Sequence, residues 1–178
     1  MTGSSAPDRL FAWSQRALAR ERARHLYMLV DGARDERIAP MLSGFGHEFR
    51  CLFDGKLDPA LAAAAPYIVE LEADFPASRA LIEAGWGNAW GVFVASSAAI
   101  DPLRRHFRRF LRVVDEAGRQ LLFRFYDPRV LRAYLPTCTA SELEFVFGPS
   151  AGFVTEADGG AALCFSRDGE ALVTTALE

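Results

Sequence analysis

The sequence predicts an α/β or α+β fold, in which a mixed β-sheet is packed by short helices and a small β-hairpin region forms the C-terminal end. Three observations lead to this prediction. Short apolar segments alternate with short helical ones, the dipeptide Asp-Pro precedes three of the helical segments, and Asp-Gly turns punctuate the end of the chain. With 178 residues, 51% of them hydrophobic, the chain can bury one core, so we expect a single domain over residues 1–178.

The first part of the chain predicts a helix followed by short strands. Residues 8–24 have an apolar side and a basic side, as an amphipathic helix does. The apolar run "HLYMLVDG" predicts a buried strand, and "HEFRCLFDG" alternates like a second strand. Between them, "RDERIAPML" predicts a short helix that Pro40 breaks or kinks.

The three Asp-Pro dipeptides predict three helix starts. An aspartate carboxylate accepts hydrogen bonds from the free N–H groups of a first turn, and proline suits the first helical position because its missing N–H is not needed there. We therefore expect Asp58, Asp101 and Asp127 to cap helices rather than to act as catalytic carboxylates.

The second half of the chain predicts further strands and one more capped helix. The strand segments are "PYIVEL" (66–71), "AWGVFVAS" (89–96), "FLRVVD" (110–115) and "RQLLFRFYD" (119–127), the last two joined by a hairpin turn. In "TASELEFVFGP", Thr139 and Glu142 predict a capping box and Gly148 predicts the helix end. Residues 150–178 are expected to form a β-rich tail, either a hairpin or a three-stranded meander.

An arginine-rich helix is expected after Pro102. Its apolar stripe would consist of Leu103, Phe107, Phe110, Leu111 and Val114, and its basic surface of Arg104, Arg105, Arg108, Arg109 and Arg112. Three interpretations are open: a solvated face with scattered ion pairs, a docking surface for an acidic protein, or a nucleic-acid site. The net charge of −3 and the absence of a nucleic-acid-binding motif disfavour the last.

The strand over residues 120–126 places Arg124 among apolar neighbours. Alternation predicts that Leu122, Arg124 and Tyr126 share one face. A charge in such a position must reach water or a carboxylate, so an ion pair is the first interpretation and a ligand contact the second.

Trp86 and Trp90 lie in the glycine-rich segment "GWGNAWG". Large aromatic side chains are typical both of cores and of protein interfaces, so either a core or a docking position is possible. No lysine followed by serine or threonine comes after the glycines, which disfavours a phosphate-binding loop.

The sequence offers no pattern typical of an enzyme or a metalloprotein. Its three cysteines have no zinc-site spacing, its three histidines are far apart, and no serine has a GxSxG frame. No export signal and no apolar run of membrane-spanning length is present. We therefore expect a cytoplasmic, non-enzymatic protein without cofactor, metal, nucleic acid or membrane. The alternative is a small-ligand-binding protein or enzyme with a pocket near Trp86, Trp90 and Arg124.

Several strings in this order resemble the bacterial adaptor/chaperone family of the type VI secretion system, long catalogued as a domain of unknown function. They are "YMLVDGAR", "CLFDGKLDPALAAAAPYIVEL", "GWGNAWGVFVAS", "LRRHFRRFLRVVDEAGRQLLFRFYDPRVLRAYLP" and "FVFGP", and they span residues 26–149. The resemblance implies an adaptor that binds a cognate secreted effector and the C-terminal region of the VgrG spike protein, and loads one onto the other. The motif positions are His106, Arg124, Tyr126, Asp127, Pro128 and Arg129, together with Gly85, Trp86, Trp90 and Arg108. The family gives them no individual roles, and most are expected to maintain the fold.

Overall fold

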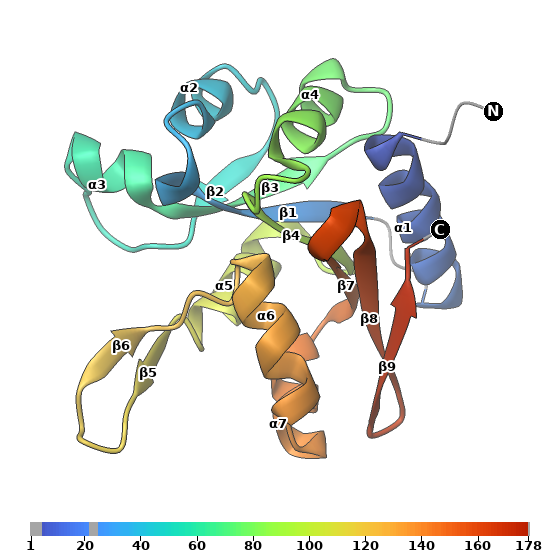
Figure 1. The fold of residues 1–178 in the computed structure, drawn as a ribbon. Helices are drawn as coiled ribbons and strands as arrows, with labels where there is room; N and C mark the ends of the chain where they lie inside the picture. The colour runs from blue at the N-terminus through green and yellow to red at the C-terminus, as the bar shows by residue number, and fades with distance from the viewer. Residues whose placement is uncertain (1–4, 22–24, 178) are drawn as a thin grey trace.

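The computed structural model describes residues 5–21 and 25–177 and confirms the α+β fold (Figure 1). In this part of the chain, seven strands form one sheet in the order β2-β3-β1-β4-β7-β8-β9, and β5 and β6 form a separate hairpin. All neighbouring strands are antiparallel, so the sheet is not mixed as the sequence suggested. The strands are β1 His25–Asp31, β2 Phe49–Cys51, β3 Pro66–Leu71, β4 Gly91–Ser96, β5 Arg112–Val114, β6 Gln120–Leu122, β7 Ser150–Glu156, β8 Ala162–Asp168 and β9 Ala171–Ala176.

Helices cover both faces of the large sheet (Figure 1). Across the described residues they are α1 Ala6–Glu21, α2 Ile38–Ser43, α3 Pro59–Ala64, α4 Pro76–Gly85, α5 Ile100–Arg108, α6 Pro128–Tyr134 and α7 Ala140–Phe147. Met28 and Val30 of β1 pack with α1, α2 and α4, whereas Tyr27 and Leu29 pack with α5, α6 and α7. Because successive side chains of a strand point to opposite faces, burial on both sides explains why β1 reads as a continuous apolar run.

Local capping follows the sequence prediction at three helices. Asp58 accepts a hydrogen bond from the Leu61 N–H at 2.9 Å, and Asp127 accepts one from the Arg129 N–H at 3.0 Å. Thr139 and Glu142 form the predicted capping box of α7. The third Asp-Pro prediction is wrong, because α5 begins at Ile100 with Ala99 as its N-cap. Asp101 lies in the first turn instead, and its carboxylate accepts from Arg50 at 3.1 Å.

The predicted arginine helix is too long. Helix α5 ends at Arg108, and residues Arg112–Val114 form β5, so Arg112 is not on the helix. The apolar stripe misled the prediction because Phe110 and Leu111 stay buried after the helix has ended, while Val114 is 67% exposed. Likewise β6 ends at Leu122, and the expected alternation through Tyr126 is wrong.

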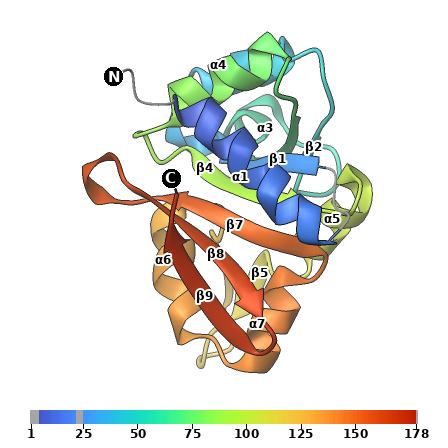
Figure 2. The same cartoon turned by 90° about the vertical axis from the view of Figure 1, so that its right-hand side faces the viewer.

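The two ends of the chain also differ in detail from the prediction. Helix α1 begins two residues before the predicted start, and residues 22–24 lie outside the described part. Pro40 does not break α2, since it lies in the first turn, where its N–H is not needed. The C-terminal strands form the predicted meander, and β7 pairs with β4, so the meander continues the large sheet beneath α1 (Figure 2).

Candidate protein-docking surface

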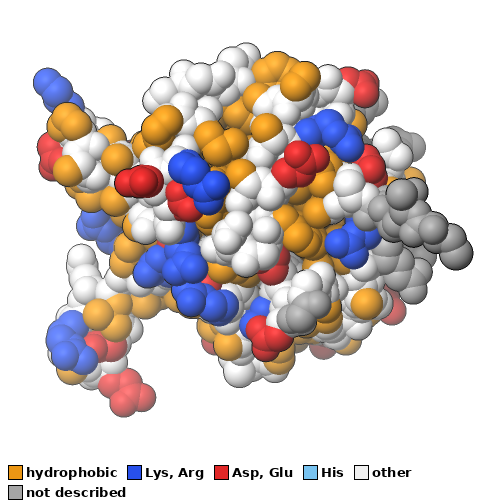
Figure 3. All heavy atoms as spheres, turned by 45° about the horizontal axis from the view of Figure 1, so that its top comes forward, with side chains coloured by type: hydrophobic (Ala, Val, Ile, Leu, Met, Phe, Trp, Pro, Cys, Tyr) orange, Lys and Arg blue, Asp and Glu red, His pale blue; other side chains and the backbone are white. Residues whose placement is uncertain are grey.

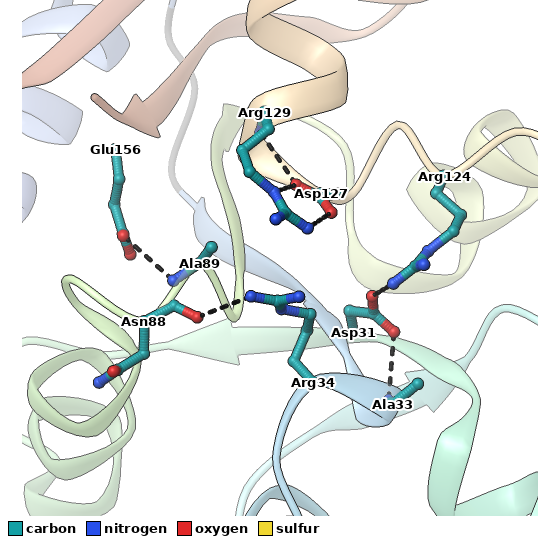
Figure 4. A network of polar contacts seen from close by, with 9 residues as sticks. All are labelled: Asp31, Ala33, Arg34, Asn88, Ala89, Arg124, Asp127, Arg129 and Glu156. Atoms are coloured by element: carbon teal, nitrogen blue, oxygen red, sulfur yellow. Dashed lines mark hydrogen bonds and ion pairs between the residues drawn. The ribbon is translucent and has the colours of Figure 1, made fainter. Parts of the chain in front are cut away.

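The segment after β6 is a structural junction (Figure 4). Arg124 forms the expected ion pair, and its partner is Asp31 at the end of β1. The Asp31 side chain is buried and also accepts a hydrogen bond from the Ala33 N–H at 3.1 Å. The hydrogen bond from Arg124 to Asp31 raises the pKa of the arginine. This arrangement holds the loop before α6 against the end of β1, an inner strand of the sheet.

Asp127 and Tyr126 complete the junction. Burial pushes the pKa of Asp127 upward, but hydrogen bonds from the side chain and backbone of Arg129 outweigh it, so the pKa is lowered overall. Burial raises the pKa of Tyr126 to about 12, which keeps the phenol protonated at neutral pH. Pro128 is buried at the first position of α6. These motif residues therefore build the start of α6.

Glu156 lies at the far side of the same network (Figure 4). It ends β7, is 9% exposed, and accepts a hydrogen bond from the Ala89 N–H at 3.2 Å. Burial raises its pKa. A hollow of about 250 Å³ beside it is lined by Arg129 and Arg132, but Arg129 is paired with Asp127, and Arg132 donates to the Glu156 carbonyl oxygen. The guanidinium groups of this hollow are thus already occupied.

Two arginines of α5 bind the loop that follows β2. Arg104 donates to the carbonyl oxygens of Cys51 and Phe53, the latter at 3.2 Å, and Arg108 pairs with Asp54. Both guanidinium-bearing side chains are only a quarter exposed. Their contacts attach the β2–α3 loop to α5, which is a structural role.

The other three arginines face solvent. Arg105, Arg109 and Arg112 are exposed, and none of them forms an ion pair with a carboxylate within the residues that the structure describes. Arg109 lies over the ring of Phe145, 4.8 Å from its centroid. The predicted surface of five arginines is therefore divided into two bound and three available cations.

His106 belongs to the core beneath this surface. Its side chain is buried, and Nε2 lies 3.0 Å from the Val146 carbonyl oxygen, to which it donates. Burial lowers the pKa of the imidazole, which favours the neutral form. Gly148, with a φ of +48°, leaves no room for a side chain against the ring. The histidine thus joins α5 to the end of α7.

Both tryptophans pack in the core on the opposite face of the sheet from α5, where Arg9 lies 5.5 Å from the ring centroid of Trp86 and Arg37 5.0 Å from that of Trp90. Trp90 is 1% exposed, so the structure places this candidate docking residue inside the core. Trp86 is half-buried and lies 6.0 Å from Phe93, centroid to centroid. Five surface hollows of about 250 to 470 Å³ are lined by other residues than Trp86, Trp90 and Arg124. The three side chains therefore do not converge on any of these hollows.

An exposed apolar groove separates α3 from the β5–β6 hairpin. It has a volume of about 430 Å³ and is lined by Phe53, Asp54, Leu57, Leu61, Arg112, Gln120, Leu121 and Leu122. Leu61, Leu121 and Leu122 are 45%, 47% and 44% exposed. At the left of Figure 3, the two projections that correspond to α3 and the hairpin both carry hydrophobic side chains, and basic side chains are visible between them.

These leucines were not recognised as surface residues from the sequence. The alternation in "RQLLFRFYD" predicted a strand, joined by a hairpin turn to residues 110–115, within a sheet packed by helices. The signal that points the other way is the turn at residues 116–118, because a hairpin of only two short strands has no neighbours to cover its side chains.

Comparison with known proteins places the chain in a family. The family model described as "Domain of unknown function (DUF4123)" matches residues 26–144, about two thirds of the 178 residues. The chain belongs to the DUF4123 family. No curated protein and no solved structure matches it significantly.

The DUF4123 match covers the residues of the junction, the arginines and the groove. It begins in β1 and ends within α7, so β7, β8 and β9 lie beyond it although β7 pairs with β4. Within residues 5–21 and 25–177, no cluster of three or more histidine, cysteine or acidic side chains is suited to a metal ion. None of the helices in this part of the DUF4123 protein combines the length and apolar character needed to cross a bilayer.

Proposed function

We propose that this DUF4123 protein is a non-enzymatic adaptor of the type VI secretion system. It binds a secreted effector in the cytoplasm and loads it onto the C-terminal region of the VgrG spike protein. The observation that carries the proposal is the exposed apolar groove between α3 and the β5–β6 hairpin. Arg112 lines it and Arg109 lines the adjoining hollow, and neither arginine has a carboxylate partner in the described chain.

The composition of this surface supports adhesion to a protein. Leucine side chains that are nearly half exposed and gathered in one groove lose unfavourable contact with water when a partner covers them. Arginine is enriched at protein interfaces because its planar group forms paired hydrogen bonds with carboxylates. The groove therefore offers apolar area for affinity and charge for orientation.

The resemblance to secretion adaptors supports the identity of the two partners. Membership of the DUF4123 family by itself gives only a domain of unknown function. The effector and the spike protein are inferred from the sequence segments that resemble the secretion adaptors. A binding role is consistent with the paired state of the buried acids and arginines around Asp31 and Asp127, which serve the fold.

Co-expression with the proteins encoded on either side of this chain tests the proposal. We expect a complex with the effector that elutes as one species in size-exclusion chromatography, and transfer of that effector to the spike protein when it is added. An effector and a spike protein from an unrelated cluster serve as the control. If neither of the two neighbouring proteins forms a complex with the chain, the proposed function is contradicted.

A further inference from the structure

The free edge of β6 lies along the apolar groove. Three consecutive residues of β6, Gln120 to Leu122, line the groove, whereas β5 contributes only Arg112. Leu57 and Leu61 lie across it, the latter on α3. In Figure 1, β6 is the strand of the hairpin nearer to α3. A strand edge that faces an apolar wall can accommodate an extended chain between the two.

The backbone register shows which groups point into the groove. Val113 pairs with Leu121, and at the ends of the hairpin the Phe123 N–H donates to Leu111 at 2.9 Å and the Asp115 N–H donates to Arg119 at 3.0 Å. Because hydrogen-bonded residues alternate along an antiparallel strand, Leu121 directs its N–H and C=O toward β5. Gln120 and Leu122 consequently direct theirs toward the free edge.

This edge is short, but it lacks the side chains that usually protect an edge strand. Natural edge strands are commonly blocked by a charged side chain or a proline. The three residues of β6 include neither, and two of them are leucines that are nearly half exposed. The other edge strand beside this region, β2, carries Arg50. The edge of β6 is therefore open to pairing.

One end of the groove is positively charged. A second hollow of about 320 Å³ shares Phe53, Asp54 and Arg112 with the groove and continues it toward Arg108 and Arg109. Asp54 is already paired with Arg108, so it does not neutralise Arg109 or Arg112. A carboxylate on the occupant would find these two cations at this end.

We propose that the groove binds an extended segment of the effector as a third strand on β6. The segment has apolar side chains at alternate positions and acidic residues at the end near Arg112. Its backbone pairs with Gln120 and Leu122 while its apolar side chains cover the leucines of the groove, as in other cases of strand addition.

The inference rests on the proposed function for the source of the segment, but its geometry can be tested without the effector. The probe is a fluorescein-labelled peptide of eight residues that alternates leucine with threonine and ends in two glutamates. A second version carries the glutamates at the other end, so that both strand directions are covered. We expect one version to bind in fluorescence anisotropy, and failure of both at about 1 mM, the weak end of measurable affinity, would overturn the inference.

N-methylation of the probe distinguishes strand addition from simple apolar binding. Only alternate N–H groups of an added strand point at β6. Methylation of that set should therefore weaken binding about ten-fold or more, because each lost hydrogen bond leaves a carbonyl of β6 unpaired, while methylation of the other set leaves affinity within about two-fold. Equal affinities for the two methylated isomers would overturn strand addition.

Variants of the protein connect the groove to the effector complex. We expect Leu61→Glu with Leu122→Glu to abolish effector binding, whereas the matched control Thr174→Glu, at an exposed position of the edge strand β9, should leave it unchanged. Circular dichroism spectra of the variants serve as the check that each variant is folded. An effector complex that survives the groove variants would overturn the inference and leave the proposed function intact. If no complex forms even with the unaltered chain, the proposed function fails, and the peptide experiment still decides the geometry of the groove.

Discussion

The guanidinium group of Arg124 donates to the buried carboxylate of Asp31, although 93 positions separate the two residues in the chain. Asp31 ends the inner strand β1, and Arg124 follows the hairpin that borders the groove. The ion pair therefore fixes the base of the proposed docking surface to an inner strand of the sheet. Arg124 is 43% exposed on its side chain and Asp31 only 2%, so the carboxylate is the member that depends on the pair.

Removal of this arginine should destabilise the fold. We expect Arg124→Ala to lower the free energy of unfolding by about 1 to 3 kcal/mol, because Asp31 would keep a buried charge with one partner fewer. Adding Asp31→Asn should recover part of the loss. The matched control is Arg119→Ala, whose 75% exposed side chain pairs with Asp115 and should cost less than about 0.5 kcal/mol. Equal urea midpoints for the Arg124 and Arg119 variants would contradict this account.

The buried carboxyl of Glu156 should make stability depend on pH. Burial raises its pKa in the folded state above the ordinary value of 4.5, so the folded chain holds this proton more tightly than the unfolded chain. The resulting loss of folding stability is absent at pH values below the ordinary pKa. It grows as the pH rises between the ordinary pKa and the raised pKa of the folded state, and it stays constant at higher pH. Each pKa unit corresponds to about 1.4 kcal/mol.

Substitution of Glu156 by glutamine removes this titration. The Tm of Glu156→Gln minus the Tm of the unaltered chain should be larger at about pH 8 than at about pH 4. At about pH 4 the two proteins differ only by the loss of the carboxyl's contacts. Thermal unfolding followed by circular dichroism at both pH values measures the difference. A Tm difference that is independent of pH would mean that the folded and unfolded chains bind this proton equally.

The two groups of arginines should respond differently to charge reversal. We expect Arg104→Glu with Arg108→Glu to cost about 1 to 3 kcal/mol of stability, because the contacts to Cys51, Phe53 and Asp54 are lost. Arg109→Glu with Arg112→Glu should change stability by about 0.5 kcal/mol or less, since both residues are exposed. The second pair should nevertheless weaken effector binding, measured by calorimetry. Unchanged affinity would remove these two arginines from the docking surface.

The features that the sequence predicted well are those set by near neighbours. Asp58, Asp127 and Thr139 cap their helices through hydrogen bonds to residues two or three positions away, so their role is visible in a short window. The order of the strands was not predictable, because it depends on contacts between segments far apart in the chain. Helix α5 was extended too far for a related reason: Phe110 is buried by tertiary contacts with Phe125 and Phe145, and its burial resembles a continued helical stripe.

The same limit applies to the candidate site. Five arginines were predicted as one surface, but whether an arginine binds its own chain depends on where Asp54 and the carbonyl oxygens of β2 lie. The role of Arg124 was predicted as an ion pair because a charge among apolar neighbours needs a partner, yet its partner Asp31 lies in a different element. The groove was missed because its two walls, α3 and β6, lie far apart in the sequence and are brought together only by tertiary folding.

The β5–β6 hairpin projects from the body of the protein, and Val113, Val114, Leu121 and Leu122 on it all remain more than a third exposed. Substitutions at such positions cost little folding free energy. Selection can therefore change the specificity of this projection rapidly while the capped helices and the buried acids stay constant. Under the proposed function, a change of effector would require only a few hairpin residues to change.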